Sequence, residues 1–324
     1  MNIVFSFASL LLVGGLSGAG DTASLLGVGT GSRMLSRRAL MGTVVLGTVV
    51  GALVGSARVP GVFEAFAPIE SPFEMLLICL ISFLGIFPLL RAGCPMTTVQ
   101  VVVASFAGLR LGKMGLTAVS SIPLIFAWVL SPLLAALMAI VLYKILALLI
   151  KVFHVNIFKL DRIIRGGIFT ALFVGSALMA ANVLPCFGAM VFPLAGASFS
   201  FWDGLPLQLV GAVGLVLGLS LQGRSVALSN SEDLFNFSFA PLMAFAALLA
   251  FCAVGWLFTF SAFGMDGIGV PLATCQVLMG ATLGLSLLYP RLCPSGRICF
   301  GMLVCWIGVP FLAFWLSWAI ALIR

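Results

Sequence analysis

The sequence predicts an all-α polytopic membrane protein made of two inverted-topology repeats of about five spans each, with some helices broken or re-entrant. Three observations support this prediction: a strongly apolar composition, ten long apolar runs, and two motifs that occur once in each half. Of the 324 residues, 62% are hydrophobic and 8% are charged, and the mean hydropathy is +1.28. Such a chain has more apolar surface than a soluble domain can bury, so we expect a multi-pass protein of the inner or plasma membrane.

Apolar runs separated by Gly, Pro or charged residues predict the individual spans. A helix needs roughly 20 apolar residues to cross about 30 Å of hydrocarbon. The expected spans are 2–17, 39–57, 74–90, 95–112, 117–150, 167–185, 206–222, 239–262, 270–289 and 299–322. They divide the chain into a first membrane repeat at 1–150, a cytoplasmic linker at 151–166 and an inverted second repeat at 167–324. Mixed charges and helically spaced aliphatic residues indicate that the linker is interfacial or helical.

The distribution of basic residues predicts the orientation. Arg33 to Arg38 follow the first run and Lys144 to Arg165 follow the fifth, whereas acidic residues follow the second. Because cytoplasmic loops are rich in Lys and Arg, the linker is expected inside and both termini outside. A simple crossing by 95–112 would leave Arg110 and Lys113 outside, so this run is expected to be re-entrant or broken.

Two pairs of motifs predict the internal repeat. Pro95–Val101 and Pro271–Val277 share Pro, Thr, Gln and Val at the same positions, 176 residues apart. Trp128–Pro132 (WVLSP) and Trp306–Pro310 (WIGVP) lie 178 residues apart. A repeat alone can reflect duplication without further meaning. However, polar side chains behind a helix-breaking Pro, placed alike in both halves, are typical of transporters that expose ligands near the middle of the membrane.

Asp21 is a carboxylate inside an apolar chain, in the glycine-rich stretch Ser17–Ser32. A carboxylate at membrane depth costs roughly 2.5–3.5 kcal/mol on insertion scales, so it usually faces a partner, a bound cation or water. The glycines permit an unwound backbone with free carbonyls and amides. Alternatively, Asp21 caps a helix, and a cap and a ligand are compatible roles.

These segments resemble the PiT family of inorganic phosphate transporters. Gly18–Gly27 resembles the family's GANDVAN signature. Pro95–Val101 and Pro271–Val277 resemble its PVSTTHA segment, present once per repeat, and the Trp128 run resembles its SWVxSPLLxG helix. The WIGVP motif resembles the matching end of the second repeat, so the resemblance covers nearly the whole chain.

The resemblance implies a secondary active transporter that moves phosphate, sulfate or a related oxyanion with a cation by alternating access. The coupling ion is expected to be Na⁺, with a site at Asp21, or H⁺; no other cofactor and no resident metal are expected. The partners are the oxyanion and the lipid bilayer, and a homodimer is common in the family. The candidate substrate- and ion-binding residues are Asp21, Thr22, Ser24, Thr97, Thr98, Gln100, Asn182, Thr274 and Gln276.

The sequence departs from the family where the signature should recur. Ser176–Asn182 aligns with it, so that Leu178 and Met179 replace its Asn and Asp. Neither side chain offers the hard oxygen that sodium prefers, so a cation site with two Asp residues cannot form. One site at Asp21, or proton coupling through Asp21, remains open. Hydroxyls, the amides of Gln100 and Gln276 and helix N-termini would bind the oxyanion, since the sequence predicts no Arg or Lys near these motifs apart from Arg33.

Other classes of function fit the sequence less well. A degenerate relative with an interaction or regulatory role is the alternative, favoured by the loss of the second aspartate. An enzyme is not expected, because the remaining acids, Asp161, Asp203, Glu232, Asp233 and Asp266, are predicted in loops. Scattered single charges argue against nucleic-acid binding despite the net charge of +7. Eight cysteines without a CxxC pair, with one histidine, argue against a metal site.

Overall fold

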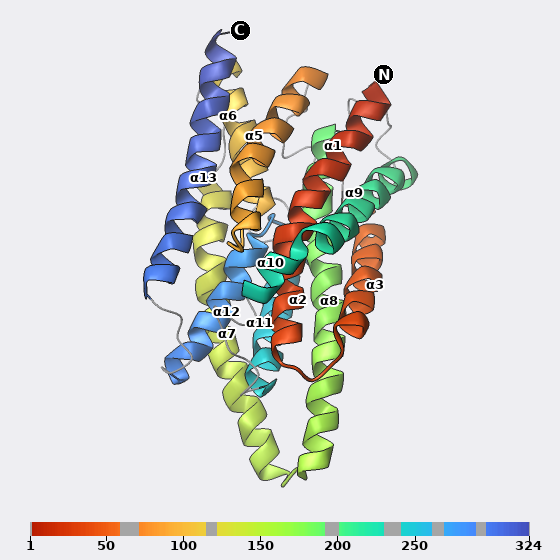
Figure 1. Ribbon diagram of the computed structural model, residues 1–324, viewed down its shortest axis with the longest axis vertical. Helices are drawn as coiled ribbons and strands as arrows, with labels where there is room; N and C mark the ends of the chain where they lie inside the picture. Colours follow the sequence, from red (N-terminus) through yellow and green to blue (C-terminus); the bar gives the residue numbers. More distant parts are fainter. Residues whose placement is uncertain are drawn as a thin grey trace.

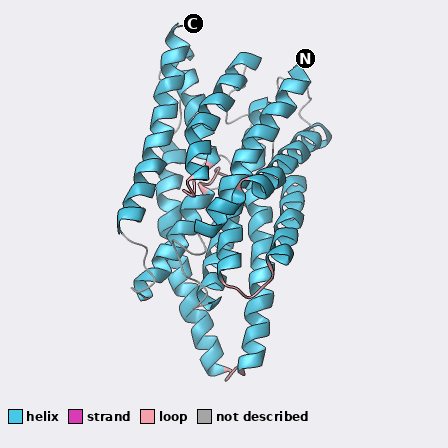
Figure 2. Ribbon diagram, in the orientation of Figure 1, coloured by secondary structure: helices cyan, strands magenta, loops and turns pink. Residues whose placement is uncertain are grey.

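The computed structural model contains only helices and their connections in the part of the chain it describes, residues 2–58, 71–114, 122–191, 201–229, 241–260, 269–289 and 296–323 (Figure 1, Figure 2). The first half contains α1 (Asn2–Ser17), the π-helical turn η1 (Gly18–Thr22), α2 (Ala23–Gly31), α3 (Arg37–Ser56), α5 (Pro72–Arg91), α6 (Thr98–Met114) and α7 (Ile122–Val152). The second half contains α8 (Ile157–Val191), α9 (Phe201–Leu221), α10 (Gly223–Leu228), α11 (Pro241–Phe260), α12 (Thr274–Leu288) and α13 (Gly296–Ile323).

Each of the ten predicted runs contains one long helix, but not every one is a simple crossing. Eight helices of the described part are long and apolar enough to span a membrane. The exceptions are α6, with 17 residues, and α12, with 15 residues. Both are shorter than the roughly 20 residues of a full crossing.

The two short helices begin late because an extended segment precedes each. Residues 92–97, which we name the first tip, and residues 269–273, the second tip, lie outside any helix. In each tip a glycine with a φ of +78°, Gly93 or Gly269, stands two residues before the proline. Such a φ is easy for glycine alone, and the residue before proline avoids the helical region. The motifs seen in the sequence are therefore helix-starting segments.

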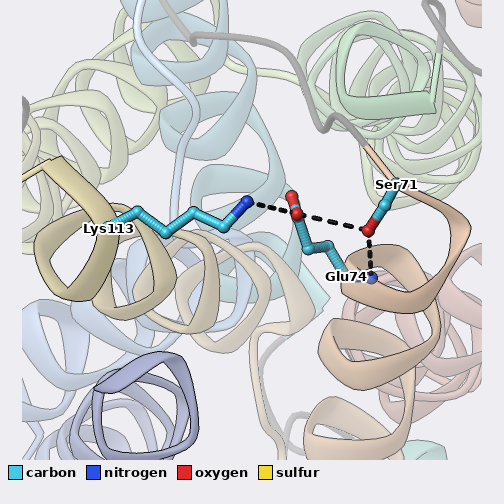
Figure 3. A network of polar contacts seen from close by, with 3 residues as sticks. All are labelled: Ser71, Glu74 and Lys113. Carbon is cyan, nitrogen blue, oxygen red and sulfur yellow. Dashed lines mark hydrogen bonds and ion pairs between the residues drawn. The ribbon is translucent and has the colours of Figure 1, made fainter. Parts of the chain in front are cut away.

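The hairpin formed by α5 and α6 returns to the side from which it started. Lys113, near the end of α6, forms an ion pair with Glu74 in the first turn of α5 (Figure 3). Ser71 caps α5 by accepting a hydrogen bond from the Glu74 backbone N–H at 3.3 Å and donates to the Glu74 carboxylate at 3.2 Å. The two ends of the hairpin therefore meet, as expected for a re-entrant run at 95–112.

Both chain termini lie at one end of the molecule, and the turn between α7 and α8 lies at the other (Figure 1). This is the relative placement that the basic residues predict. Which end faces the cytoplasm stays a prediction, and Glu64 and Glu70, on which it partly rests, lie outside the described residues.

The segment 151–166, predicted as a linker of interfacial or helical character, is mostly helical in the structure. Helix α7 continues to Val152 and α8 begins at Ile157, so only a four-residue turn separates them. Helix α8 starts early because the Asn156 side chain accepts a hydrogen bond from the Phe158 N–H at 3.2 Å. Asp161 and Arg165 then form an ion pair one turn apart, at 3.1 Å.

The acids predicted in loops include two that lie in helices. Asp161 is the fifth residue of α8, and Asp203 is the third residue of α9. Charged residues near the start of a helix interrupt the apolar pattern of its interior. These segments were therefore predicted as loops. Glu232, Asp233 and Asp266 lie outside the described residues.

The packing of the helices is similar in the two halves. Helix α6 packs against α13 and α5, and α12 packs against α7 and α11. Helix α1 packs against α9, and α3 packs against α8. This matches the pattern that an inverted repeat predicts; the repeat itself stays a prediction. The tips of both hairpins meet beside η1, which positions the site described next.

Candidate functional site

Asp21 lies in a π-helical turn and not in an unwound segment, which corrects the sequence-based expectation. The backbone remains helical from α1 through η1 to α2. The glycine before the aspartate allows a close approach, because a Cβ on Gly20 would collide with the backbone carbonyl of Met96 in the first tip. The small residues therefore let the first tip reach the helix, and single π turns of this kind often occur at functional sites.

The Asp21 carboxylate is completely buried and receives hydrogen bonds from three segments. Ser17, one turn earlier, donates its hydroxyl to Oδ2 at 2.7 Å. The backbone N–H of Thr98, at the start of α6, donates to the same oxygen at 3.4 Å. The Cys275 thiol, at the start of α12, donates to Oδ1 at 3.3 Å. Asp21 therefore joins its own helix to the first turns of both short helices. The alternative that Asp21 caps a helix beginning after Gly20 is wrong, because the backbone is helical through both residues and Thr22 precedes α2 without a side-chain cap.

Each tip is anchored to a long helix by a tryptophan. The indole N–H of Trp306 in α13 donates to the carbonyl of Pro95 at 2.8 Å. In the same way, the indole N–H of Trp128 in α7 donates to the carbonyl of Pro271 at 2.9 Å. The repeated Trp and Pro motifs thus make the same contact in the two halves.

The predicted hydroxyl residues lie on the segments that meet at Asp21, and two of them have hydroxyls without a partner in the described part of the chain. Thr97 accepts a hydrogen bond on its hydroxyl oxygen from the Cys275 backbone N–H at 3.2 Å. Ser24 donates to the Gly20 carbonyl at 2.8 Å and lies 3.4 Å from the Cys275 sulfur. The hydroxyls of Thr22 and Thr98 are buried without a hydrogen-bond partner in the described part of the chain. A buried hydroxyl without a partner costs about 1–3 kcal/mol, which a bound species would remove.

Gln100 and Gln276, one helical turn beyond the tips, bind each other. Gln100 Nε2 donates to Gln276 Oε1 at 3.1 Å, and Gln276 Nε2 donates to Gln100 Oε1 at 2.9 Å. Both side chains are at most 8% exposed. The buried Thr274 begins α12 next to Cys275. Of the predicted residues, all but Asn182 therefore lie on the π turn or on the first turns and tips that contact it.

Asn182 lies at the second tip and has its polar atoms engaged there. Its amide N–H groups donate to Thr259 and to the Val270 carbonyl, at 3.0 and 2.9 Å, and its oxygen accepts from the Leu272 N–H at 2.7 Å. Asn182 thus holds the second tip in place in this structure.

A basic residue reaches the second tip, contrary to the sequence-based prediction that only Arg33 comes near. Arg58, just after α3, donates from Nη1 to the Ala181 carbonyl at 2.7 Å. Its guanidinium also borders Gly269, on the side where a Cβ would point. The prediction failed because Arg58 follows the second expected span, far from the motifs in sequence, and the fold turns its side chain back against α8.

Four residues that contribute to the site were missed, although the sequence held a signal for each. Cys275 stands between Thr274 and Gln276 within the repeated motif. Ser17 precedes Asp21 by four residues, the spacing of one helical turn. Two glycines, Gly93 and Gly269, precede the prolines of the repeated motif by two residues each. Met179 and Leu178 are buried in α8 and add no oxygen, as the departures in the sequence predict.

The arrangement combines one carboxylate, a shell of hydroxyls and two amides where two short helices begin. The carboxylate and hydroxyls suit a small hard cation or a proton, and the helix N-termini and amides suit an anion. Within the described residues, no group of three His, Cys, Asp or Glu side chains could hold a metal ion.

The chain is similar along most of its length to two proteins named as permeases. A protein of Methanocaldococcus jannaschii that is named a phosphate permease is 23% identical over 313 residues, 97% of this chain and 93% of that protein. The sulfate permease of Bacillus subtilis is 24% identical over 315 residues, 93% of this chain and 82% of that protein. No family model matches the chain.

The fold is also that of a known transporter structure. A solved structure of a sodium-dependent phosphate transporter superimposes with a TM-score of 0.76 and 15% identity, over 99% of this chain and 98% of that one. Together with the apolar helices, these similarities identify the chain as an integral, multi-pass membrane protein.

Proposed function

We propose that this protein, a PiT-like permease by its sequence relatives and its fold, is a secondary active transporter of phosphate or sulfate. It moves a tetrahedral oxyanion together with a cation, and it is a transporter and not an enzyme. The relatives carry the names of a phosphate and a sulfate permease, and the similar structure is that of a phosphate transporter. The class of substrate in this proposal comes from these names. The expectation that the chain transports comes from the geometry of its site.

The observation that carries the proposal is the position of Asp21. Its carboxylate is fully buried and is held by donors from α1, α6 and α12. A charge in this position is costly unless it works with a counter-charge. A site where two hairpin tips meet on opposite sides of one carboxylate is the geometry expected for alternating access, because each tip can close one side.

The coupling ion is proposed to bind at the carboxylate. Sodium would take oxygens from Asp21 and from the unpartnered hydroxyls of Thr22 and Thr98, which have no other hydrogen-bond acceptor or donor within the described residues. A proton would bind the carboxylate alone and would need no such shell. The unpartnered hydroxyls support sodium over a proton.

The oxyanion is proposed to bind between the first turns of α6 and α12. The N-termini of both helices meet beside Asp21, since the Thr98 N–H and the Cys275 thiol both donate to its carboxylate. Helix N-termini attract anions through free backbone N–H groups and the helix dipole. The Gln100 and Gln276 amides add neutral donors, so the site can bind an anion without an arginine.

The test is uptake by purified protein in liposomes. Labelled phosphate and labelled sulfate are each offered under an inward sodium gradient, an inward proton gradient or no gradient. The proposal predicts uptake of at least one anion, stimulated by one gradient, with competition by the other anion if both are substrates. Uptake of neither anion above protein-free liposomes, under any gradient, would contradict it.

A second candidate function rests on the second half of the chain. Where the signature of the family would place Asn and Asp, α8 has the buried Leu178 and Met179. Such a chain could keep the fold and act as an interaction or regulatory protein in the membrane. The liposome experiment separates the two candidates, because this one predicts no uptake from correctly folded protein.

A further inference from the structure

We propose that the Gln100–Gln276 amide pair is a latch that holds the two halves of the site together and opens when the oxyanion takes over its N–H groups. This inference rests on the proposed transport function. It identifies the contact that keeps the site closed and that breaks when the site opens.

The latch crosses between two groups of helices. Helix α6 packs against α5 and α13, whereas α12 packs against α7 and α11. Within each group the tip is also fixed by an indole N–H, from Trp306 to Pro95 in one and from Trp128 to Pro271 in the other. Each tip therefore moves with its own long helix.

Between the two groups, the short helices are joined near Asp21 by breakable contacts. These are the two amide hydrogen bonds of the glutamine pair and the bond from the Cys275 N–H to the Thr97 hydroxyl. None of these groups carries a formal charge. Neutral hydrogen bonds contribute modestly to stability because water or another polar partner can replace them. The direct contacts between the two groups are thus weaker than the packing within each group, and the remaining link runs through Asp21, which accepts from the first turns of both short helices.

The chemistry of the pair makes it sensitive to an oxyanion. Each amide in the pair uses one N–H and one oxygen, and each amide has a second N–H. An oxyanion accepts hydrogen bonds and offers few or none in return. If the amides turn their N–H groups to the anion, the mutual bonds break, and the anion replaces them with charge-assisted bonds. The exchange keeps the N–H groups of both amides satisfied, because the anion accepts from them. The two amide oxygens, which lose the mutual bonds and which the anion cannot serve, take hydrogen bonds from water that enters as the site opens.

Cys275 provides a natural reporter of the latch. It precedes Gln276 directly, its side chain is fully buried, and it contacts both Asp21 and Ser24. When the two groups of helices part at the latch, this thiol becomes accessible to a small reagent. The other seven cysteines, Cys79, Cys94, Cys186, Cys252, Cys293, Cys299 and Cys305, would be replaced with Ala or Ser, and the resulting protein checked for uptake and thermal stability.

The experiment measures the rate at which a small methanethiosulfonate reagent labels Cys275. The double variant Gln100→Leu with Gln276→Leu keeps apolar bulk and removes both partners, so it leaves no unpaired amide behind. We expect it to be labelled about tenfold faster or more than the parent, since two hydrogen bonds across the boundary are lost. Equal labelling rates would overturn the latch.

Gln208 provides the matched control. It is a buried glutamine of α9 that donates to the Leu184 carbonyl at 3.2 Å and belongs to neither short helix nor tip. Gln208→Leu makes the same chemical change, and we expect it to leave the labelling of Cys275 unchanged. Equally fast labelling in this control would mean that loosening of the whole fold, and not the latch, exposes the thiol, and would overturn the inference. The single variant Gln100→Leu is measured too, in case the double variant does not fold, and the same outcomes decide.

Uptake measurements separate the latch from the proposed function. In the double variant we expect a higher KM for the oxyanion, because two donors are gone; fast labelling with an unchanged KM would overturn the role given to the substrate. Labelling needs no transport. If the parent takes up neither anion, the proposed function fails, while the labelling rates still decide whether the pair holds the site closed.

Discussion

Replacing Asp21 with asparagine tests the role of the charge while keeping the shape of the side chain. An amide oxygen in the place of Oδ2 can still accept from the Ser17 hydroxyl and the Thr98 N–H. The amide nitrogen would then face the Cys275 sulfur, which can accept in turn. The contacts therefore persist, and only their strength and the charge are lost.

The expected change in stability is small for asparagine and larger for alanine. A hydrogen bond to a charged group contributes about 1.5–3 kcal/mol and a neutral one about 0.5–1.5 kcal/mol. The weakened bonds of Asp21→Asn are offset because a carboxylate no longer has to be buried. Asp21→Ala instead leaves the Thr98 N–H unsatisfied, which costs about 1–3 kcal/mol, whereas Ser17 can turn to a carbonyl of its own helix.

The assay combines uptake with thermal stability. Both variants are expected to lose cation-stimulated uptake in cells that lack their own phosphate and sulfate transporters, and Asp21→Ala is expected to melt at a lower temperature than Asp21→Asn in detergent. The reasoning is refuted if folded Asp21→Asn takes up the anion at the parent's rate with the same dependence on the gradient. Equal melting temperatures for the two variants would refute the part that rests on the Thr98 hydrogen bond.

Four further substitutions, with two controls, test the contacts around the site. Gly20→Ala should lower the melting temperature, because a Cβ there meets the Met96 carbonyl. The control Gly42→Ala, which has open space around it, should leave the melting temperature unchanged or raise stability by up to about 1 kcal/mol. Equal effects of the two substitutions would contradict the close approach. Trp128→Phe and Trp306→Phe should each slow uptake, by loss of a hydrogen bond that contributes about 0.5–1.5 kcal/mol, and the exposed Trp315→Phe should not. Cys275→Ser should keep uptake and abolish its inhibition by thiol reagents, so persistent inhibition would show that another cysteine is responsible.

The helices could be predicted because lipid leaves few alternatives for an apolar chain. In lipid every backbone N–H and C=O must be paired, so each apolar run forms a helix. The Gly, Pro and charged residues between the runs mark where one helix ends and the next begins. The limits of the short helices were less predictable. The run 95–112 began as an extended tip, because Gly93 and Pro95 prevent a helix from forming there, a local effect that an average over hydropathy does not register.

Within the candidate site, the sequence identified residues but not their partners. The repeated motif pointed to Thr97, Thr98, Gln100 and Gln276, yet each was expected to face a ligand. That the two glutamines face each other depends on the angle between α6 and α12, which no local pattern encodes. Cys275 was passed over because a cysteine in an apolar run usually fills space, and its bond to Asp21 is a contact across 254 residues.

A structure determined with sulfate or phosphate bound tests the central claim most directly. The account predicts the anion between the first turns of α6 and α12, beside Asp21, with the Gln100 and Gln276 amides separated from each other and directed to it. An anion bound elsewhere in the protein, with the two tips and the amide pair arranged as they are here, would contradict it.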